Sequence, residues 1–400
     1  MSLTTLRESI RATRDVIYMN TGFTGPSPEP VLQRMREALE YEATVGPASV
    51  EGLAANRQLA EDARATVAAL LNGDPDEVAI THGTTEGMNV VIYGMDWKPG
   101  DEFVSCSLEH PALATPCQVL AERYGATVKA VDVAANATAA EALAAFKAAI
   151  TPHTKLVAIS HVQYSCGLKL PLKEIIDVAH AAGTLVAVDG AQTGGQLALD
   201  VRALGVDFYS ISGQKWVLGP NGTGALWVKR DHIRNIEPLF TTNSIADTRA
   251  LPGDGPGGGN PLMRFRIASQ SPALTAGFGK AISLLQEIGM EEIEAHCARL
   301  GDRLRAGVGD IKGATLTGPT DPAATCGLTA VAIGGWEPRQ VVDALWNRYR
   351  VAVRAVASPP AIRFSTAPFN TEAEVDKALD ALRTVASEPA PPVEEGAGAH

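Results

Sequence analysis

From about residue 59 onward, apolar positions along the chain follow two alternating periods. Short continuous apolar runs indicate buried strands, and the segments between them carry apolar residues at helical spacing. We expect strands at 78–80, 102–106, 127–131, 156–161, 185–189, 208–211 and 224–228. We expect helices at 59–71, 84–93, 112–123, 139–149 and 172–182. This alternation predicts an α/β fold with a mostly parallel central sheet covered on both faces.

A Gly/Pro-rich stretch at 252–261 interrupts this alternation and predicts a mobile loop near a domain junction. We expect the wider region 238–261 to shape the substrate entrance. Beyond it, the pattern predicts a long helical stretch at 272–300 and then a smaller α+β unit. Its strands are expected at 328–333, 351–354 and 361–365, and its helices at 338–349 and 372–385. The expected division is a large domain at 18–262, a small domain formed by 1–17 with 263–386, and a disordered tail at 387–400.

Composition narrows the class of protein. A length of 400 residues and a hydrophobic fraction of 46% suit two packed domains with a sizeable core. The net charge of −11 argues against nucleic acid or an anionic membrane as a partner, and no apolar run is long enough for a transmembrane helix. The N-terminus does not read as a signal peptide. The five cysteines are scattered, without CxxC or zinc spacing, so we expect reduced thiols in a cytoplasmic protein and no metal site.

Two polar residues follow neighbouring strands of the expected sheet. Asp189 ends the strand at 185–189, and Lys215 lies in a small-residue turn after the strand at 208–211, before a glycine-rich loop at 219–224. Ligands of such sheets gather at the carboxyl ends of the strands. A lysine and a carboxylate at that edge suit pyridoxal 5'-phosphate (PLP). The lysine holds the cofactor as a Schiff base, and the aspartate keeps the pyridine nitrogen protonated.

A possible phosphate site precedes the helix expected at 84–93. Gly83, Thr84 and Thr85 stand where a helix start offers free backbone N–H groups and hydroxyls to an anion. Taken alone this motif is nonspecific, since threonine is a common N-cap residue.

Several motifs occur together in one order: Tyr-Met-Asn-Thr-Gly at 18–22, Gly-Thr-Thr-Glu-Gly at 83–87, Glu-His at 109–110, Asp-Gly-Ala-Gln at 189–192, Ser-Gly-Gln-Lys at 212–215, and Arg363. With them the chain resembles the class V aminotransferases, the cysteine-desulfurase-like branch of the fold-type I PLP enzymes, from about residue 18 to 385. Segments 20–26 and 45–47 look most like cysteine/cystine C–S lyases. Isopenicillin N epimerase-like proteins are a second near relative.

The resemblance implies roles for residues around the cofactor. It implies that His110 stacks on the cofactor ring and helps in proton transfer, and that Gln192 contacts the phenolic oxygen. Ser212 and Gln214 would complete the phosphate cradle. The relatives also imply a homodimer with active sites at the interface, in which Ser269 brings a hydroxyl to the partner's phosphate.

On the substrate side, the resemblance implies that Arg363 clamps the α-carboxylate, with Arg354 as an alternative for this role. Asn20, Thr21 and Tyr164 are expected to contact the amino-acid substrate. Three features depart from the family pattern. Gln214 replaces a common histidine, Tyr164 replaces a common asparagine, and the segment 351–363 lacks the cysteine that carries a persulfide in desulfurases.

Without that nucleophile, the expected reaction is β-elimination from cysteine, cystine or a related sulfur amino acid, giving pyruvate, ammonia and a sulfur product. Epimerisation and transamination use the same lysine and electron sink and stay open as alternatives. A non-catalytic binding protein on a degenerate enzyme fold is a further alternative. Retention of Lys215, Asp189, Gln192 and the phosphate motif argues against it.

Overall fold

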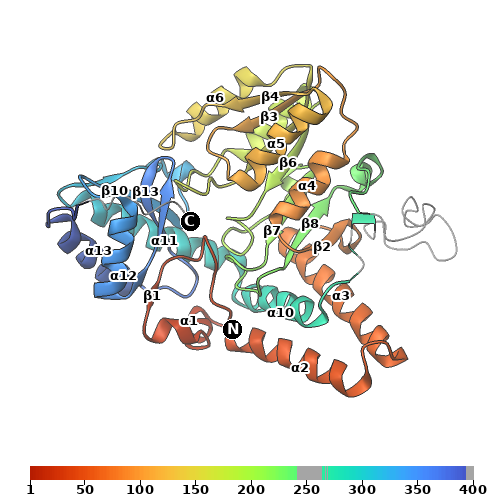
Figure 1. Ribbon diagram of the computed structural model, residues 1–400, viewed down its shortest axis with the longest axis horizontal. Helices are drawn as coiled ribbons and strands as arrows, with labels where there is room; N and C mark the ends of the chain where they lie inside the picture. Colours follow the sequence, from red (N-terminus) through yellow and green to blue (C-terminus); the bar gives the residue numbers. More distant parts are fainter. Residues whose placement is uncertain (241–263, 266, 268, 393–400) are drawn as a thin grey trace.

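The structure is a computed structural model that describes residues 1–240, 264, 265, 267 and 269–392. Its larger unit is a seven-stranded sheet in the order β2-β8-β7-β6-β5-β3-β4, with helices on both faces (Figure 1). The strands are β2 (Val78–Thr81), β3 (Glu102–Cys106), β4 (Thr127–Val131), β5 (Thr154–Ser160), β6 (Leu185–Asp189), β7 (Phe208–Ser212) and β8 (Gly224–Val228). Of these, β8 alone runs against its neighbours, and every other pair is parallel. The predicted mostly parallel α/β sheet is therefore confirmed.

Successive residues of each central strand enter two different apolar cores. Val186 and Val188 pack with α3 (Val50–Leu71), α6 (Ala139–Ala149) and α7 (Leu172–Ala181). Ala187 faces the opposite core, which α4 (Thr84–Gly94) and α5 (Pro111–Tyr124) cover. Because both faces are buried, these strands appear in the sequence as continuous apolar runs without polar alternation.

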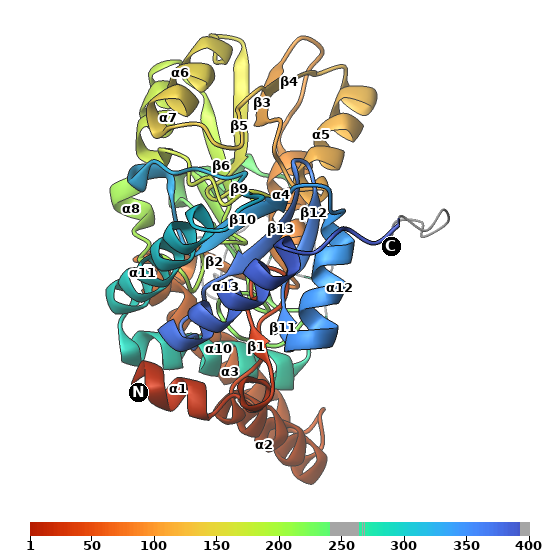
Figure 2. The same ribbon diagram turned by 90° about the vertical axis from the view of Figure 1, so that its left-hand side faces the viewer.

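A second, four-stranded antiparallel sheet forms the smaller unit, in the order β12-β13-β10-β9 (Figure 2). Its strands are β9 (Ala314–Leu316), β10 (Leu328–Ile333), β12 (Arg354–Ala357) and β13 (Pro360–Ser365). Helices α11 (Met290–Gly309), α12 (Pro338–Tyr349) and α13 (Glu372–Ala386) pack on it and share a third apolar core. This is the α+β unit that the sequence predicts.

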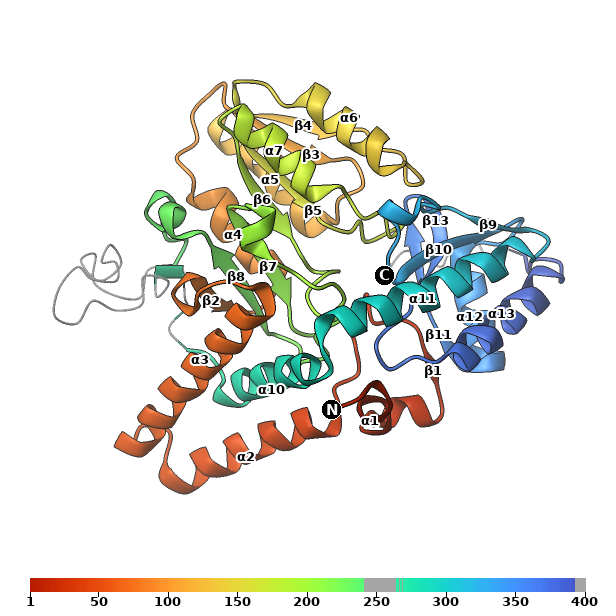
Figure 3. The same ribbon diagram turned by 180° about the vertical axis from the view of Figure 1, so that it is seen from behind.

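The helical stretch expected at 272–300 is two helices. It divides at Gly289, whose φ of 103° lies outside helical geometry and separates α10 (Pro272–Ile288) from α11. Helix α10 packs against α2 (Glu29–Val45) and α3, on the side of the large sheet (Figure 3). The strand expected at 351–354 is likewise two short strands, β11 (Val351–Ala352) and β12. The domain boundaries stay a prediction, with α10 packed toward the large unit.

Two predicted segments fall partly or wholly outside the described residues. The loop predicted at 252–261 lies outside them, as does 393–400 of the predicted tail. At the start of that tail, Glu388 forms two 2.7 Å contacts with the guanidinium of Arg348 on α12. None of the described helices is both long and apolar enough to cross a membrane.

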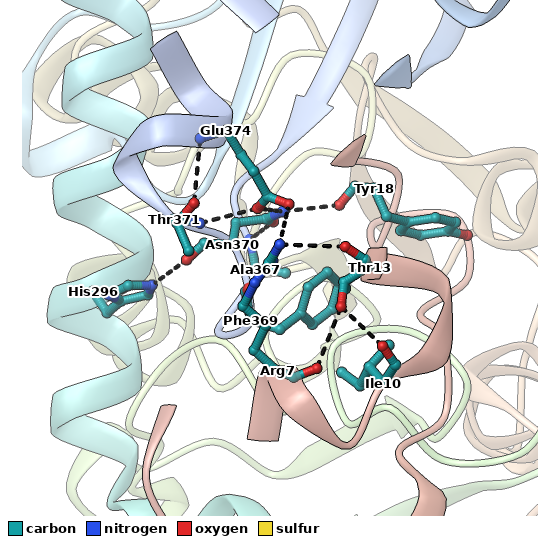
Figure 4. Close-up of polar contacts among 10 residues, drawn as sticks. All are labelled: Arg7, Ile10, Thr13, Tyr18, His296, Ala367, Phe369, Asn370, Thr371 and Glu374. Atoms are coloured by element: carbon teal, nitrogen blue, oxygen red, sulfur yellow. Dashed lines mark hydrogen bonds and ion pairs between the residues drawn. The ribbon is translucent and has the colours of Figure 1, made fainter. Parts of the chain in front are cut away.

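The N-terminal segment is bound to the loop after β13 and to α13 of the smaller unit by partly buried polar contacts (Figure 4). Arg7, in α1 (Leu3–Glu8), donates from Nη1 to the carbonyl oxygen of Phe369 at 2.8 Å and pairs through Nη2 with Glu374 at 2.8 Å. Asn370 donates to the carbonyl oxygen of Tyr18 at 3.1 Å. Strand β1 (Ile17–Tyr18) then pairs in parallel with β11. These contacts position residues 19–25, the crossing segment, which runs from the small sheet toward the turn after β7.

Candidate active site

A cavity of about 880 Å³ lies between the two sheets, at the carboxyl ends of the parallel strands. The large sheet supplies Ser160 from the end of β5, Asp189 from β6 and Ser212 from β7. The small sheet supplies Arg354 and Arg363 from β12 and β13. The predicted residues that line the cavity are Gly83, Thr84, Thr85, His110, Tyr164, Asp189, Gln192, Ser212, Gln214, Lys215 and Arg363.

Lys215 lies in a tight turn that the crossing segment contacts directly. The amide of Gly25 donates to the carbonyl oxygen of Gln214 at 2.7 Å, and that of Leu218 donates to Lys215 at 3.0 Å. A Cβ at Gly25 would lie 2.5 Å from the carbonyl oxygen of Lys215, so only glycine permits this approach. The lysine keeps some surface open to the cavity. Burial nevertheless lowers its pKa to about 8, although the nearby Asp189 raises it.

Asp189 is buried at the end of β6, and its Oδ1 accepts a hydrogen bond from the amide of Ala191 at 2.9 Å. Burial raises the pKa of Asp189, while Lys215 and the Ala191 amide oppose that shift. A buried carboxylate with few donors is stabilised by a cation placed against it. The geometry therefore suits a protonated ring nitrogen facing Asp189.

The phosphate motif and the end of β7 are in contact. Thr84 Oγ1 and Ser212 Oγ are 2.5 Å apart, at the N-terminus of α4. Gln214 Oε1 is buried without a partner among the described residues. At Gly83 an added Cβ would meet no heavy atom within 4 Å, so this position leaves open space at the helix start. Hydroxyls, backbone N–H groups and open space together suit a phosphate.

Arg363 is only 1% exposed, yet most of its donors are free. Nη1 donates to the carbonyl oxygen of Tyr164 at 2.6 Å, whereas Nε and Nη2 have no hydrogen-bond partner among the described residues. Burial, and then the charge of Arg354, lower the pKa of Arg363 to about 9. An anion that meets the free edge of the guanidinium would satisfy both donors and relieve that shift.

His110 is the N-cap residue of α5, and its Nδ1 accepts from the amide of Ala112 at 3.1 Å. Its ring meets that of Tyr164 edge-on, with centroids 4.8 Å apart and an interplanar angle of 82°. Burial, together with the charges of Lys215, Arg354 and Arg363, lowers the pKa of His110 to about 4. The imidazole is therefore neutral at pH 7.

Gln192 lines the cavity but also has structural contacts. Its Nε2 donates to the carbonyl oxygen of Gly22, and its Oε1 accepts from Trp216 Nε1, each at 2.9 Å. These bonds link the crossing segment, β6 and the lysine turn. One Nε2 hydrogen stays available for the contact with the phenolic oxygen that the resemblance implies.

Three predicted residues do not line the cavity of the described chain. Asn20 Oδ1 and Thr21 Oγ1 are buried without hydrogen-bond partners among the described residues, and the lining of the cavity begins at the next residue, Gly22. Ser269 is exposed. Their predicted contacts to substrate and to a partner's phosphate stay predictions.

Other lining residues were not predicted from the sequence. His82 Nδ1 and Glu86 Oε2 lie 2.7 Å apart beside the helix start. Ser160 also lines the cavity, and buried Glu109 lies behind it, outside the lining. Glu109 accepts hydrogen bonds from the Ser160 amide at 2.8 Å and from Gln163 Nε2 at 2.9 Å. Burial raises the pKa of Glu109 to about 7. In the sequence, only the Glu-His motif at 109–110 indicated that Glu109 belongs near the site.

A lysine, a buried aspartate, a helix start that suits a phosphate and an arginine with two unpaired nitrogens surround one cavity, an arrangement that fits the fold-type I PLP-dependent enzymes. Residues 17–378 match the family Aminotransferase class-V, and the chain belongs to this family. A probable cysteine desulfurase of Methanothermobacter thermautotrophicus is 31% identical over 356 residues, covering 88% of this chain and 86% of that protein. Isopenicillin N epimerase of Streptomyces clavuligerus is 28% identical over 398 residues, covering 93% and 96%.

Solved structures of related enzymes also match this chain over nearly its whole length. The complex of the cystine C-S lyase C-DES with its reaction product cysteine persulfide matches with a TM-score of 0.84 and 28% identity, covering 94% of this chain and 99% of that one. A C-DES variant with glycine covalently linked to its PLP cofactor matches with a TM-score of 0.86 and 28% identity, covering 94% and 98%. The protein is thus a cysteine-desulfurase-like class V enzyme, and its cofactor is PLP.

PLP should load onto the apoenzyme fastest above pH 8. Burial lowers the pKa of Lys215 to about 8, so the reactive neutral amine accumulates as pH rises through that value. We expect the rate at which the visible band appears to rise up to about pH 8 and then level off. For a lysine with an ordinary pKa, this rate would keep rising until about pH 10. Stopped-flow mixing of apoenzyme with PLP measures this. A rate that still climbs steeply at pH 10 would contradict the lowered pKa.

Proposed function

We propose that the enzyme catalyses β-elimination on cysteine, cystine or a related sulfur amino acid, releasing pyruvate, ammonia and a sulfur product, without a persulfide-carrying cysteine. The observation that carries this proposal is the structure of the hairpin that holds both arginines. Arg354 on β12 is the Cα partner of Arg363 on β13, and Ala357 pairs with Pro360, so only two residues connect the strands. A turn of that length leaves no room for a mobile loop that presents a thiol to the substrate.

The placement of the five thiols also supports elimination. Cys106, Cys117, Cys166, Cys297 and Cys326 are all free and buried, and none lines the cavity. Burial raises the pKa of every one of them, so each stays in the unreactive thiol form at neutral pH. Free thiols throughout are also in keeping with a cytoplasmic location, which we propose with the function.

The remaining residues have consistent roles. We assign Arg363 to the substrate α-carboxylate, with Arg354 beside it, and Asp189 to the ring nitrogen. Lys215 removes the proton from Cα. Bound PLP supplies a conjugated ring that takes up the electron pair released at Cα, so that the bond from Cβ to sulfur can break. Neutral His110 would cover the ring face and orient it.

We further propose a homodimer with active sites at the interface. Phe23, Leu239 and Phe240 line the cavity mouth, and each is exposed in the single chain. A second copy would cover these apolar side chains and give exposed Ser269 a phosphate to contact. Sedimentation of the holoenzyme at the mass of one subunit would contradict this.

Product analysis tests the reaction. The holoenzyme is incubated separately with L-cystine, L-cysteine and L-alanine, and pyruvate, ammonia and sulfide are measured. We expect pyruvate and ammonia in equal amounts from cystine or cysteine, and none from alanine. Formation of L-alanine from cysteine would indicate a desulfurase. A D-isomer without pyruvate would instead favour epimerisation, the activity named for the Streptomyces relative.

A further inference from the structure

Tyr164 places a free phenol among the groups that surround the substrate. Its carbonyl oxygen accepts from Arg363 Nη1, and its ring contacts His110, so the residue connects the carboxylate side of the cavity with the cofactor side. No described residue hydrogen-bonds its hydroxyl, and the side chain lines the cavity half-buried. A tyrosine held by its backbone and ring, with its hydroxyl unused, is available to a ligand.

Neutral His110 is poorly suited to donate a proton in the proton-transfer role that the resemblance implies. A backbone N–H always donates, so the Nδ1 that receives the Ala112 amide must carry a lone pair. The neutral ring therefore has its proton on Nε2, and a neutral imidazole N–H is a very weak acid. Burial and three neighbouring cations keep His110 from gaining a second proton, with its pKa lowered to about 4.

We propose that Tyr164 is the acid that protonates the departing sulfur. This inference rests on the proposed β-elimination. As the bond from Cβ to sulfur breaks, its electron pair goes to sulfur, the phenol proton of Tyr164 passes to that sulfur, and the phenolate regains a proton from water. Lys215 holds the proton taken from Cα. Two different groups thus handle the two protons, so neither has to move between Cα and the leaving group.

The charges around Tyr164 support this assignment. Burial lowers the pKa of both Arg354 and Arg363, and the phenol of Tyr164 opposes that shift in each. Both guanidinium groups therefore lie within electrostatic range of the Tyr164 phenol. The two carboxylates among the described lining residues, Glu86 on α4 and Asp189 on β6, belong to the large unit and not to the strands that carry the arginines.

Leaving-group dependence tests the acid role with the holoenzyme. Tyr164→Phe removes only the hydroxyl, for which the described residues provide no hydrogen-bond partner. L-cysteine needs its sulfur protonated, whereas β-chloro-L-alanine expels chloride, which needs no proton. We expect kcat for L-cysteine to fall by about 10²-fold and kcat for β-chloro-L-alanine to change by less than about threefold. Tyr124→Phe, the same change at an exposed position on α5, is the matched control.

Two measurements besides turnover separate the acid role from a structural one. The visible band of the bound cofactor and the rate of solvent-deuterium exchange at Cα of L-alanine should match wild type, since Lys215 performs that exchange. Equal losses on both elimination substrates, or loss of exchange, would overturn the proposal in favour of a packing role. If Tyr164→Phe lowers kcat for neither substrate, the proposal is overturned and both protons are assigned to Lys215. If the wild-type enzyme makes no pyruvate from either substrate, the proposed function and the acid role both fail. If the wild-type enzyme makes pyruvate but Tyr164→Phe lowers kcat equally for L-cysteine and β-chloro-L-alanine, only the acid role fails.

Discussion

Lys215→Ala should lose both the visible cofactor band and at least about 10³-fold of the proposed elimination activity, because we assign both the binding of PLP and the removal of the Cα proton to this one amine. Lys215 is the only lysine among the described residues that line the cavity, so no second primary amine is placed to hold the cofactor there. The measurement combines an absorption spectrum of the PLP-reconstituted variant with a pyruvate assay on L-cystine.

Lys173→Ala is the matched control for this change. Lys173 is exposed on α7 and pairs with Asp177 one helical turn away, so its removal should leave both readouts at the wild-type level. A Lys215→Ala protein that kept the band and the pyruvate activity would place the cofactor on another residue and remove the basis for the proposed mechanism.

The second large effect is expected for Arg363→Lys. A lysine keeps the charge but loses the planar fork, so the α-carboxylate loses a paired contact and the Tyr164 carbonyl loses its donor. The dissociation constant of L-alanine, read from the shift of the cofactor band, should rise by about 10²-fold. L-Alaninamide has no carboxylate, so its affinity should change little. The preference for the acid over the amide should therefore disappear in the variant.

Two further variants control the arginine assignment. Arg339→Lys changes an exposed arginine on α12 and should leave both dissociation constants unchanged. Arg354→Lys tests the alternative directly, since Arg354 lines the same cavity on the neighbouring strand. A larger loss of carboxylate preference in Arg354→Lys than in Arg363→Lys would reverse the assignment.

The crossing segment links the substrate side of the cavity to the cofactor side. Gly22 donates to Ser365 Oγ at 3.0 Å, two residues from Arg363, and Gly25 donates to Gln214, next to Lys215. An added Cβ at Gly22 would lie 3.1 Å from Arg363 Nη2 and 2.9 Å from Gln192 Oε1. The backbone here is therefore packed so closely that the positions of the arginine and the lysine depend on the same seven-residue crossing segment, 19–25.

The sequence predicted the large sheet well because its strands are short, apolar and buried on both faces. Asp189 and Lys215 could be placed at one edge on the same ground, since parallel strands end together. The helices before residue 59 were not predicted. In α2, Val31 and Ala38 are the only buried positions, so its apolar stripe is too sparse to stand out. The break at Gly289 was missed because the apolar spacing continues on both sides of it.

By itself, the sequence determined the fold class and indicated that Lys215, Asp189 and the helix start at 83–85 would lie near one edge of the sheet, where they line the cavity. Hydrophobic periodicity, strand ends and short motifs are local properties of a chain, so they can be recognised without the tertiary structure. Only the tertiary structure decided how each side chain is used. Gln192 bonds to Gly22 and Trp216, His110 presents a neutral Nε2–H, and Arg363 keeps two free donors. Hydrogen-bond partners and burial depend on residues far apart in the chain, and these set the charge and the free atoms with which each group meets a ligand.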